Sequence, residues 1–414
     1  MKEKIKNILT SGFFKKLTGD FMFSVIGLVI YYVAIQFLIY PQIKAQLGSE
    51  GYGNVLFYIS FISIMASTLG TAANYSRMIL SSDKRDTNGD YNRIMLISAL
   101  LCVPVVTVLA IIYKLTLILA IGFLIAMVAT LYRYYSDCEF KLSIKYSGLF
   151  FYYLIAAAGN ILGVFIFKKT NNWTFPLFLG EALAVVFVML RGNIYRKPFL
   201  QKSEHYSDAQ KSFWTLVAAN IIPALILNSD RLLLKMIHGG SAAEIYYTAS
   251  LIGKSISFLT TPLNGVLIGY LARWSGKFTK KIWFMSAGAL FAVGVLATFA
   301  CFVGSYIYVG FIYPDDLDTI KQYFFIANAG QIFYFISNSL MVIVLRFAEE
   351  KYQTIINAIY AVLFIAVVPV LSYFFEINGF AVGLLIVNFA KFFIVVLIGL
   401  HKIKQSGSKI EIKE

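Results

Sequence analysis

Six charged side chains lie inside stretches of sequence that are otherwise apolar enough to cross a lipid bilayer. These residues are Glu181, Asp230, Arg231, Lys235, Lys254 and Lys391. A charge at membrane depth is costly even on insertion scales, so such residues are usually paired, turned toward water or functional. Four of the six are cations, and this excess favours chemistry with an anion.

The position of each charge along its apolar run predicts its depth. At a rise of about 1.5 Å per residue, Asp230 falls about 10 Å and Lys254 about 12 Å below the outer surface, with Glu181 at a similar level. The same rise per residue places Lys391 near the middle of the membrane. Asp230 and Arg231 are sequence neighbours, so on a helix they cannot face each other. We therefore predict that Lys254 is the partner of Asp230.

Two interpretations of these charges remain open. In the first, they form structural ion pairs that hold neighbouring helices together, and Lys235 is an end residue whose long stem reaches the interface. In the second, Arg231, Lys254 and Lys391 line a cationic cavity and bind an anionic substrate.

Two arginines lie at the inner ends of apolar runs. Arg77 follows Tyr75-Ser76, and Arg346 lies between Leu345 and Phe347. Either residue could be a plain anchor at the membrane surface. Alternatively, both ring the cytoplasmic mouth of a pathway and bind phosphate, because the planar fork of arginine suits phosphate oxygens.

The composition shows which elements must position these residues. The chain has 414 residues, of which 59% are hydrophobic and 14% charged, and its mean hydropathy is +0.74. Soluble domains carry about 25% charged residues, so the sequence predicts an all-α polytopic membrane protein. Because a bilayer core needs about 20 apolar residues per helix, we predict twelve spans. They are 20–40, 54–75, 94–113, 115–134, 146–167, 173–190, 213–237, 246–270, 282–308, 323–345, 353–374 and 378–400.

The twelve spans divide into two lobes of six helices. The longest polar interruption between spans, 191–212, separates the sixth from the seventh. We therefore predict an N-terminal lobe at 1–200, and a C-terminal lobe with a polar tail at 201–414.

The net charge of +15 suggests nucleic acid, but its distribution argues against that partner. With the N-terminus inside, 27 of the 36 Lys and Arg residues fall in inner segments and 5 in outer loops. This asymmetry follows the positive-inside rule and predicts that both termini are cytoplasmic. The basic excess therefore reflects topology, and some inner loops are expected to contact anionic membrane lipids.

The sequence carries no constellation that predicts catalysis, a metal or a cofactor. Its three cysteines, Cys102, Cys138 and Cys301, are too scattered for a disulfide framework or a zinc site. The three histidines are equally scattered. A phosphate-binding Gly-rich loop is also missing, so we do not expect the chain to hydrolyse a nucleotide or to be an enzyme.

Several short motifs resemble one known family. They are the segment Asn228-Ser229-Asp230-Arg231-Leu232-Leu233-Leu234, the segment Ile245-Tyr246-Tyr247-Thr248-Ala249-Ser250, the segment Thr261-Pro262-Leu263-Asn264, the glycine-bearing turn from Gly48 to Gly53, and Arg77. In this combination the chain resembles the polysaccharide repeat-unit flippases of the multidrug/oligosaccharidyl-lipid/polysaccharide exporter (MOP) superfamily.

The resemblance implies a transporter of the bacterial cytoplasmic membrane. Such a protein moves an undecaprenyl-diphosphate-linked oligosaccharide between leaflets by alternating access, in contact with membrane lipids and polysaccharide assembly proteins. Arg231, Lys254, Lys391, Arg77 and Arg346 would then bind the substrate. Asp230 and Glu181 would form ion pairs or carry the coupling ion or proton.

Two other classes remain as alternatives. A drug or cation antiporter of the same superfamily should have a net acidic binding site, whereas the charges in these spans are mostly positive. A membrane polysaccharide polymerase or ligase usually needs a sizeable outer loop. The longest outer loop here, from Gly310 to Gln322, is short.

Overall fold

The computed structural model describes residues 25–82, 85–143, 146–256, 264, 279–347 and 351–406. All regular secondary structure in these ranges is helical, which confirms the predicted all-α class. Eight stretches within them are long and apolar enough to cross a membrane.

Two of these stretches contain two predicted spans each. Val25–Ser81 covers the first and second spans, and Tyr352–His401 covers the last two. The first stretch is interrupted at Gly48, whose φ of 71° is readily adopted only by residues without a Cβ. The second is interrupted at Phe375 and Glu376. The predicted turns between these spans are therefore present as breaks within long helices.

Other predicted spans differ from the structure at their ends. The span 173–190 corresponds to α8 (Phe175–Arg191), which has 17 residues. The span 213–237 is split into α9 (Tyr206–Leu227) and α10 (Ser229–His238) by a break at Asn228. The span 246–270 begins within α11 (Gly240–Ser255) and then runs largely outside the described residues.

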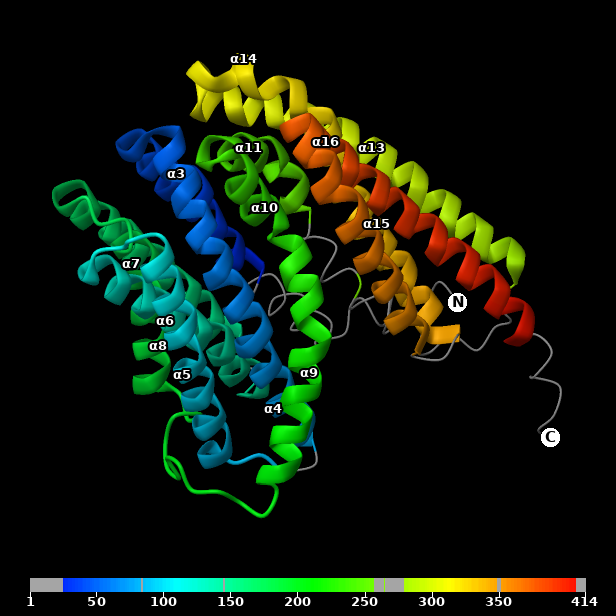
Figure 1. Cartoon of the computed structure of the whole chain (residues 1–414). Coiled ribbons are helices and arrows are strands. Elements are labelled where there is room, and N and C mark those ends of the chain that lie inside the picture. Colours follow the sequence, from blue (N-terminus) through cyan, green and yellow to red (C-terminus); the bar gives the residue numbers. More distant parts are fainter. Residues whose placement is uncertain are drawn as a thin grey trace, which may run out of the picture. The chain divides into compact units, whose positions relative to one another are not determined.

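The chain forms two compact units, of which the first is Met1–Asn228. Along the chain this unit contains, besides α8 and α9, the elements η1 (Ala34–Ile39), α3 (Tyr40–Met65), η2 (Ala66–Gly70), α4 (Thr71–Ser82), α5 (Asn88–Ile112), α6 (Leu117–Ser143) and α7 (Tyr146–Thr170). Helices α7 and α8 share the most extensive packing, and α6 packs on α8, η2 and α5 (Figure 1). Helix α9 packs on α4, α5 and η2, so it belongs to this unit although the predicted division at residue 200 assigns it to the second lobe.

The second unit is Ser229–Glu414. After α10 and α11 it contains α13 (Lys280–Ile312), η3 (Pro314–Asp316), α14 (Leu317–Ile320), η4 (Lys321–Tyr323), α15 (Phe324–Phe347) and α16 (Lys351–Ser406). Helix α15 packs along α16, α13 and α11. The buried core includes Trp283, Phe333 and Phe392, and the Trp283 Nε1–H donates to the Val396 carbonyl at 3.1 Å.

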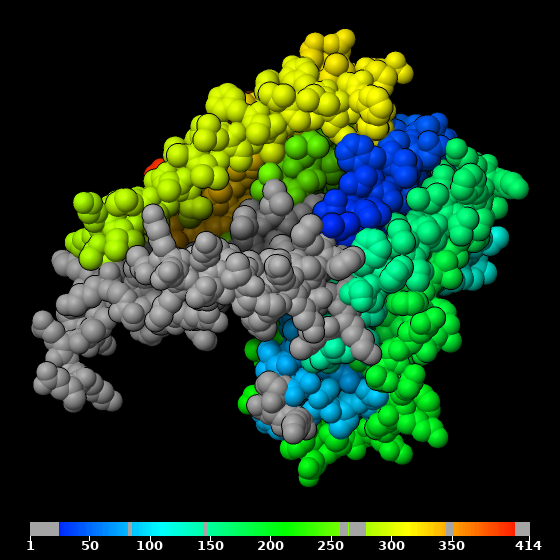
Figure 2. Space-filling view, turned by 180° about the vertical axis from the view of Figure 1, so that it is seen from behind, coloured from blue at the N-terminus to red at the C-terminus, as the bar shows by residue number. Residues whose placement is uncertain are grey.

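Large apolar side chains cover the outer faces of the helices. On α13, which is drawn in yellow-green at the surface in Figure 2, Leu296, Ile307 and Phe311 are exposed. Apolar exposure on this scale marks a surface that contacts lipid or protein rather than water. Together with the eight apolar stretches, it supports a multi-pass membrane protein.

Helices α7 and α8 come close together at Gly180, which provides a test of the fold. A Cβ at this position would lie 1.9 Å from the Ala156 carbonyl oxygen, so a side chain would force the helices apart. We expect Gly180→Val to destabilise the protein by about 1–3 kcal/mol, the usual cost of overpacking. Thermal unfolding in detergent measures the effect. Gly288→Val is the matched control, because Gly288 has open space around its Cβ position. Equal unfolding temperatures for the two variants would contradict this packing.

Candidate functional site

The charged residues of α10 and α11 form a cluster in the second unit. Asp230 and Arg231 lie in the first turn of α10 and are buried. Lys254 lies near the end of α11, and its Nζ donates to the Asp230 carboxylate. The predicted pairing of Asp230 with Lys254 is therefore confirmed. It was predictable because both residues fall at one depth on adjacent helices.

The aromatic ring of Tyr247 lies beside both cations of this cluster. The Arg231 guanidinium is 5.2 Å and the Lys254 Nζ 5.0 Å from the ring centroid. At such distances the electron-rich ring face attracts a cation. A second buried carboxylate, that of Glu244, accepts a hydrogen bond from the Thr248 hydroxyl at 3.0 Å. The site is thus a pair of cations around one tyrosine, with Asp230 bonded to the lysine.

Lys391 forms a separate site between α15 and the two halves of α16. It is 2% exposed, and its Nζ donates to the Asn338 amide oxygen at 2.8 Å. The Nζ also lies 4.5 Å from the Tyr334 ring centroid and 4.4 Å from that of Tyr360. Among the described residues, no carboxylate lies within ion-pair distance of this lysine. A buried ammonium is therefore held by two rings and one amide.

A hydrogen-bonded chain fixes one ring of this cage. The Tyr360 hydroxyl donates to the Asn388 Oδ1 at 2.7 Å, and the Asn388 Nδ2 donates to the Gly330 carbonyl at 2.8 Å. Because Asn388 is buried and lies on the same helical segment as Lys391, it sets the position of the ring against the ammonium.

The isolation of Lys391 predicts an effect on stability. Replacing a buried charge by an apolar side chain of similar length is often stabilising, so we expect Lys391→Met to stabilise the protein by about 1 kcal/mol or more. Thermal unfolding in detergent is the measurement. Lys321→Met is the control, since Lys321 is exposed and bonded to the exposed Asp318, and it should change little. A lower unfolding temperature for Lys391→Met would show that the two rings and the amide fully compensate the charge.

In the first unit, Glu181 is the acceptor of a buried ion pair. Its carboxylate accepts from the Arg133 Nε and from the Tyr31 hydroxyl. The Arg133 guanidinium lies 4.8 Å from the Tyr31 ring centroid and 4.6 Å from that of Tyr134. These groups border a cavity of about 110 Å³, which Gln36 also lines. Two roles were predicted for Glu181, forming an ion pair or carrying the coupling ion or proton. The structure contains the ion pair.

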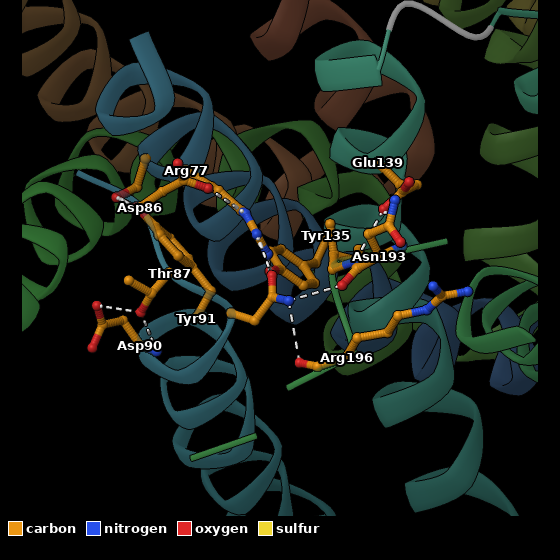
Figure 3. Close-up of polar contacts among 12 residues, drawn as sticks. Arg77, Asp86, Thr87, Asp90, Tyr91, Tyr135, Glu139, Asn193 and Arg196 are labelled. Carbon is orange, nitrogen blue, oxygen red and sulfur yellow. Dashed lines mark hydrogen bonds and ion pairs between the residues drawn. The ribbon is translucent and has the colours of Figure 1, made fainter. Parts of the chain in front are cut away.

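Arg77 is buried in a hydrogen-bonded network rather than pointing into open space (Figure 3). Its Nε donates to the Asp86 carboxylate at 3.1 Å, its Nη1 to the Tyr135 hydroxyl at 2.6 Å and its Nη2 to the Asn88 Oδ1 at 2.6 Å. Three of its five N–H donors are therefore engaged within the unit. A role of Arg77 in binding substrate remains a prediction.

Part of the predicted site lies outside the described residues. Arg346 belongs to α15, but its side chain is not among those described. The segment 261–263 of the third motif is also outside them. No group of three or more His, Cys, Asp or Glu side chains that could hold a metal ion occurs in the described part of the chain.

Comparison with known proteins identifies the fold. No family model matches the sequence, and no curated protein matches it. The structure is similar to an inward-facing multidrug resistance MATE family transporter of the MOP superfamily, with 12% identity, a TM-score of 0.64, and 94% of this chain and 99% of that chain covered. It is also similar to a mutant of the Vibrio cholerae MATE transporter VcmN, with 12% identity, a TM-score of 0.62 and coverage of 94% and 97%. The chain therefore shares its fold with these two transporters.

A third protein with a similar fold is relevant to the charges. A MOP superfamily transporter from Pyrococcus furiosus is 12% identical, with a TM-score of 0.55 and 95% of each chain covered. It is described as having a binding pocket of reverse polarity that suggests a different function. Similarity at this level of identity concerns the fold, so substrate must be argued from the residues of this chain.

Sequence reasoning missed several residues that the fold brings to the sites. Arg133 lies at the inner end of the predicted span 115–134, whereas α6 continues as a helix to Ser143. Tyr31 was indistinguishable from the many other aromatic residues, and Tyr247 was part of a motif but was given no role of its own. One signal for Arg133 was available, because the buried Glu181 requires a cation.

Proposed function

We propose that this protein is a flippase that moves undecaprenyl-diphosphate-linked oligosaccharide repeat units across the bacterial cytoplasmic membrane by alternating access. The similarity in fold to MOP-superfamily transporters supports a transport role. The basic inner segments support a multi-pass orientation with both termini in the cytoplasm. Membrane lipids and polysaccharide assembly proteins are the partners expected for this role.

The observation that carries the proposal is the pair of cations at Tyr247. Arg231 and Lys254 are within 5.2 Å of the same ring, and the lysine is bonded to Asp230. A diphosphate carries its negative charge over several oxygens that each accept hydrogen bonds. A guanidinium and an ammonium side by side therefore match it in charge and in donors.

Aromatic and amide side chains near the cations suit the sugar portion. Tyr334, Tyr360, Asn338 and Asn388 surround Lys391 in the second unit. Amides supply both donors and acceptors for hydroxyl groups. The caged ammonium of Lys391 adds a contact for an acidic group on the substrate.

A drug or cation antiporter is the second candidate function. It is favoured by the multidrug resistance MATE transporter to which the structure is similar. The buried cations Arg231 and Lys391 count against it, because a cationic substrate in such surroundings would meet like charges.

Reconstitution into proteoliposomes tests both candidates. We expect a fluorescent undecaprenyl-diphosphate oligosaccharide placed in the inner leaflet to become accessible to an external glycosidase faster than in protein-free liposomes. A cationic dye loaded into the same vesicles should not be exported. Export of the dye without movement of the lipid would replace the flippase assignment by that of an antiporter.

A further inference from the structure

The segment between the sixth and seventh predicted spans is held against the first unit by four side chains (Figure 3). Asn88 Nδ2 donates to the Asn193 carbonyl at 2.8 Å and to the Arg196 carbonyl at 3.1 Å. The Glu139 Oε2 accepts from the backbone N–H groups of Asn193 and Ile194 at 2.9 and 3.0 Å. We call residues 192–205 the linker. Its first half is therefore fixed to the start of α5 and to the end of α6.

The far end of the linker is fixed as well. The Asp90 carboxylate accepts from the Ser203 N–H at 2.9 Å and from its hydroxyl at 2.5 Å. A Cβ on Gly89 would lie 2.1 Å from the Gln201 carbonyl oxygen, so the backbone of α5 lies directly against the linker. In its first half, the Tyr195 hydroxyl is 2.7 Å from the Ser136 hydroxyl.

Arg77 positions the central residue of this attachment. Its Nη2 donates to the Asn88 Oδ1, which fixes the orientation of the amide so that its Nδ2 group faces the linker carbonyls. The Tyr135 hydroxyl and the Asp86 carboxylate hold the guanidinium in place from two other sides. Arg77 thus acts through Asn88 as a positioning residue for the linker.

Helix α9, which follows the linker, is attached to the same unit. It packs on α4, α5 and η2, and Asp208 near its start accepts from Arg85 at 3.4 Å. The helix ends at Leu227, and Asn228 leaves the helical conformation with φ −105° and ψ 2°. Its Nδ2 donates back to the Ala224 carbonyl at 2.7 Å, and α10 begins at the next residue as part of the second unit.

We propose that the linker and α9 move as part of the first unit, and that the two units pivot about Asn228–Ser229. Hinges are commonly a few residues at the end of an element that absorb a change in backbone angles, and here the chain crosses between units at a break of this kind. The inference rests on alternating access in the proposed function. It places the pivot directly before Asp230 and Arg231. An anion bound by Arg231 is therefore held next to the hinge, three residues after Asn228.

Distances between spin labels in lipid nanodiscs test the pivot. Leu100 on α5, Trp214 on α9 and Met236 on α10 are exposed, and cysteine substitutions there give one pair within the first unit and one pair across Asn228. Without any ligand, we expect the 100–214 distances to form one narrow distribution, and the 214–236 distribution to be at least twofold wider. A 214–236 distribution as narrow as the 100–214 one, or the reverse order of widths, would overturn the proposal. The widths of the two distance distributions are measured without substrate. The result can therefore be interpreted even if the flipping assay fails.

Limited trypsin digestion tests the attachment of the linker, which contains Arg196 and Lys202. We expect Asn88→Ala/Glu139→Gln to be cleaved at these residues at least tenfold faster than the unmodified protein. Ser203→Ala removes the hydroxyl that bonds Asp90 and the His205 N–H but keeps the bond from the Ser203 N–H to Asp90, so it should give a smaller increase. Ser98→Ala is the control, since the Ser98 hydroxyl donates to the Ile94 carbonyl within α5. Cleavage of the unmodified protein as fast as of these variants would overturn the attachment, and size-exclusion chromatography shows whether each variant is folded.

Discussion

Replacing Arg231 by glutamine is expected to reduce flipping of the lipid-linked oligosaccharide by about 10- to 100-fold while the protein still inserts and accumulates. A hydrogen bond to a charged group contributes about 1.5–3 kcal/mol, and each 1.4 kcal/mol corresponds to about tenfold in binding. Arg231→Lys keeps the charge but loses the planar fork, so its activity should be intermediate. The proteoliposome assay measures all three proteins.

Lys254 requires a more careful experiment, because it is bonded to Asp230. Lys254→Gln alone leaves a buried carboxylate without its cation, and breaking a buried pair in this way costs about 3–5 kcal/mol. A loss of flipping in this variant could then reflect unfolding. The double variant Asp230→Asn/Lys254→Gln removes both charges, and we expect it to recover most of the lost stability.

The double variant separates the two interpretations of the cluster. If Lys254 contacts the diphosphate, the double variant is folded but flips at least tenfold more slowly than the unmodified protein. If the pair serves structure alone, flipping returns together with stability. Lys321→Gln removes an exposed cation far along the sequence and controls for the change in net charge. Normal flipping in both Arg231→Gln and the double variant would exclude the cationic site.

The class of fold could be predicted from the sequence because each apolar run is long enough to demand a helix in lipid. The pairing of Asp230 with Lys254 was predictable for a similar reason, since a fixed rise per residue converts sequence position into depth. The break at Asn228 was not predictable. Asn228 looks no different in the sequence from Asn220, which α9 includes without a break, and Pro223 also lies inside α9.

The position of Arg133 shows why the charges themselves were harder to assign. A charged residue at the edge of an apolar run is normally taken as the end of a membrane span, and Arg133 marked such an edge. In the structure α6 continues beyond it to Ser143, because Glu181 neutralises the guanidinium and two tyrosine rings cover it. Partners from other helices therefore decide whether a charge ends a span, and a single sequence does not reveal them.

The ion pair between Arg133 and Glu181 gives the second prediction with a large expected effect. Glu181→Gln and Arg133→Gln should each destabilise the protein by about 3–5 kcal/mol, since each leaves one buried charge uncompensated. Tyr31→Phe removes one hydrogen bond to the carboxylate and should cost about 1.5–3 kcal/mol. Thermal unfolding in detergent is the measurement. A change below about 1 kcal/mol in both charge variants would show that the pair is not essential to the first unit.

The double variant Arg133→Gln/Glu181→Gln tests whether Glu181 also carries a coupling ion. Both charges are gone, so we expect stability to recover to within about 1–2 kcal/mol of the unmodified protein. If the pair is purely structural, flipping by this variant still responds to an imposed ion gradient or membrane potential. If Glu181 is the carrier, the variant is folded but its flipping no longer depends on the gradient. Since Arg133 and Tyr31 already occupy the two carboxylate oxygens, we expect the first result.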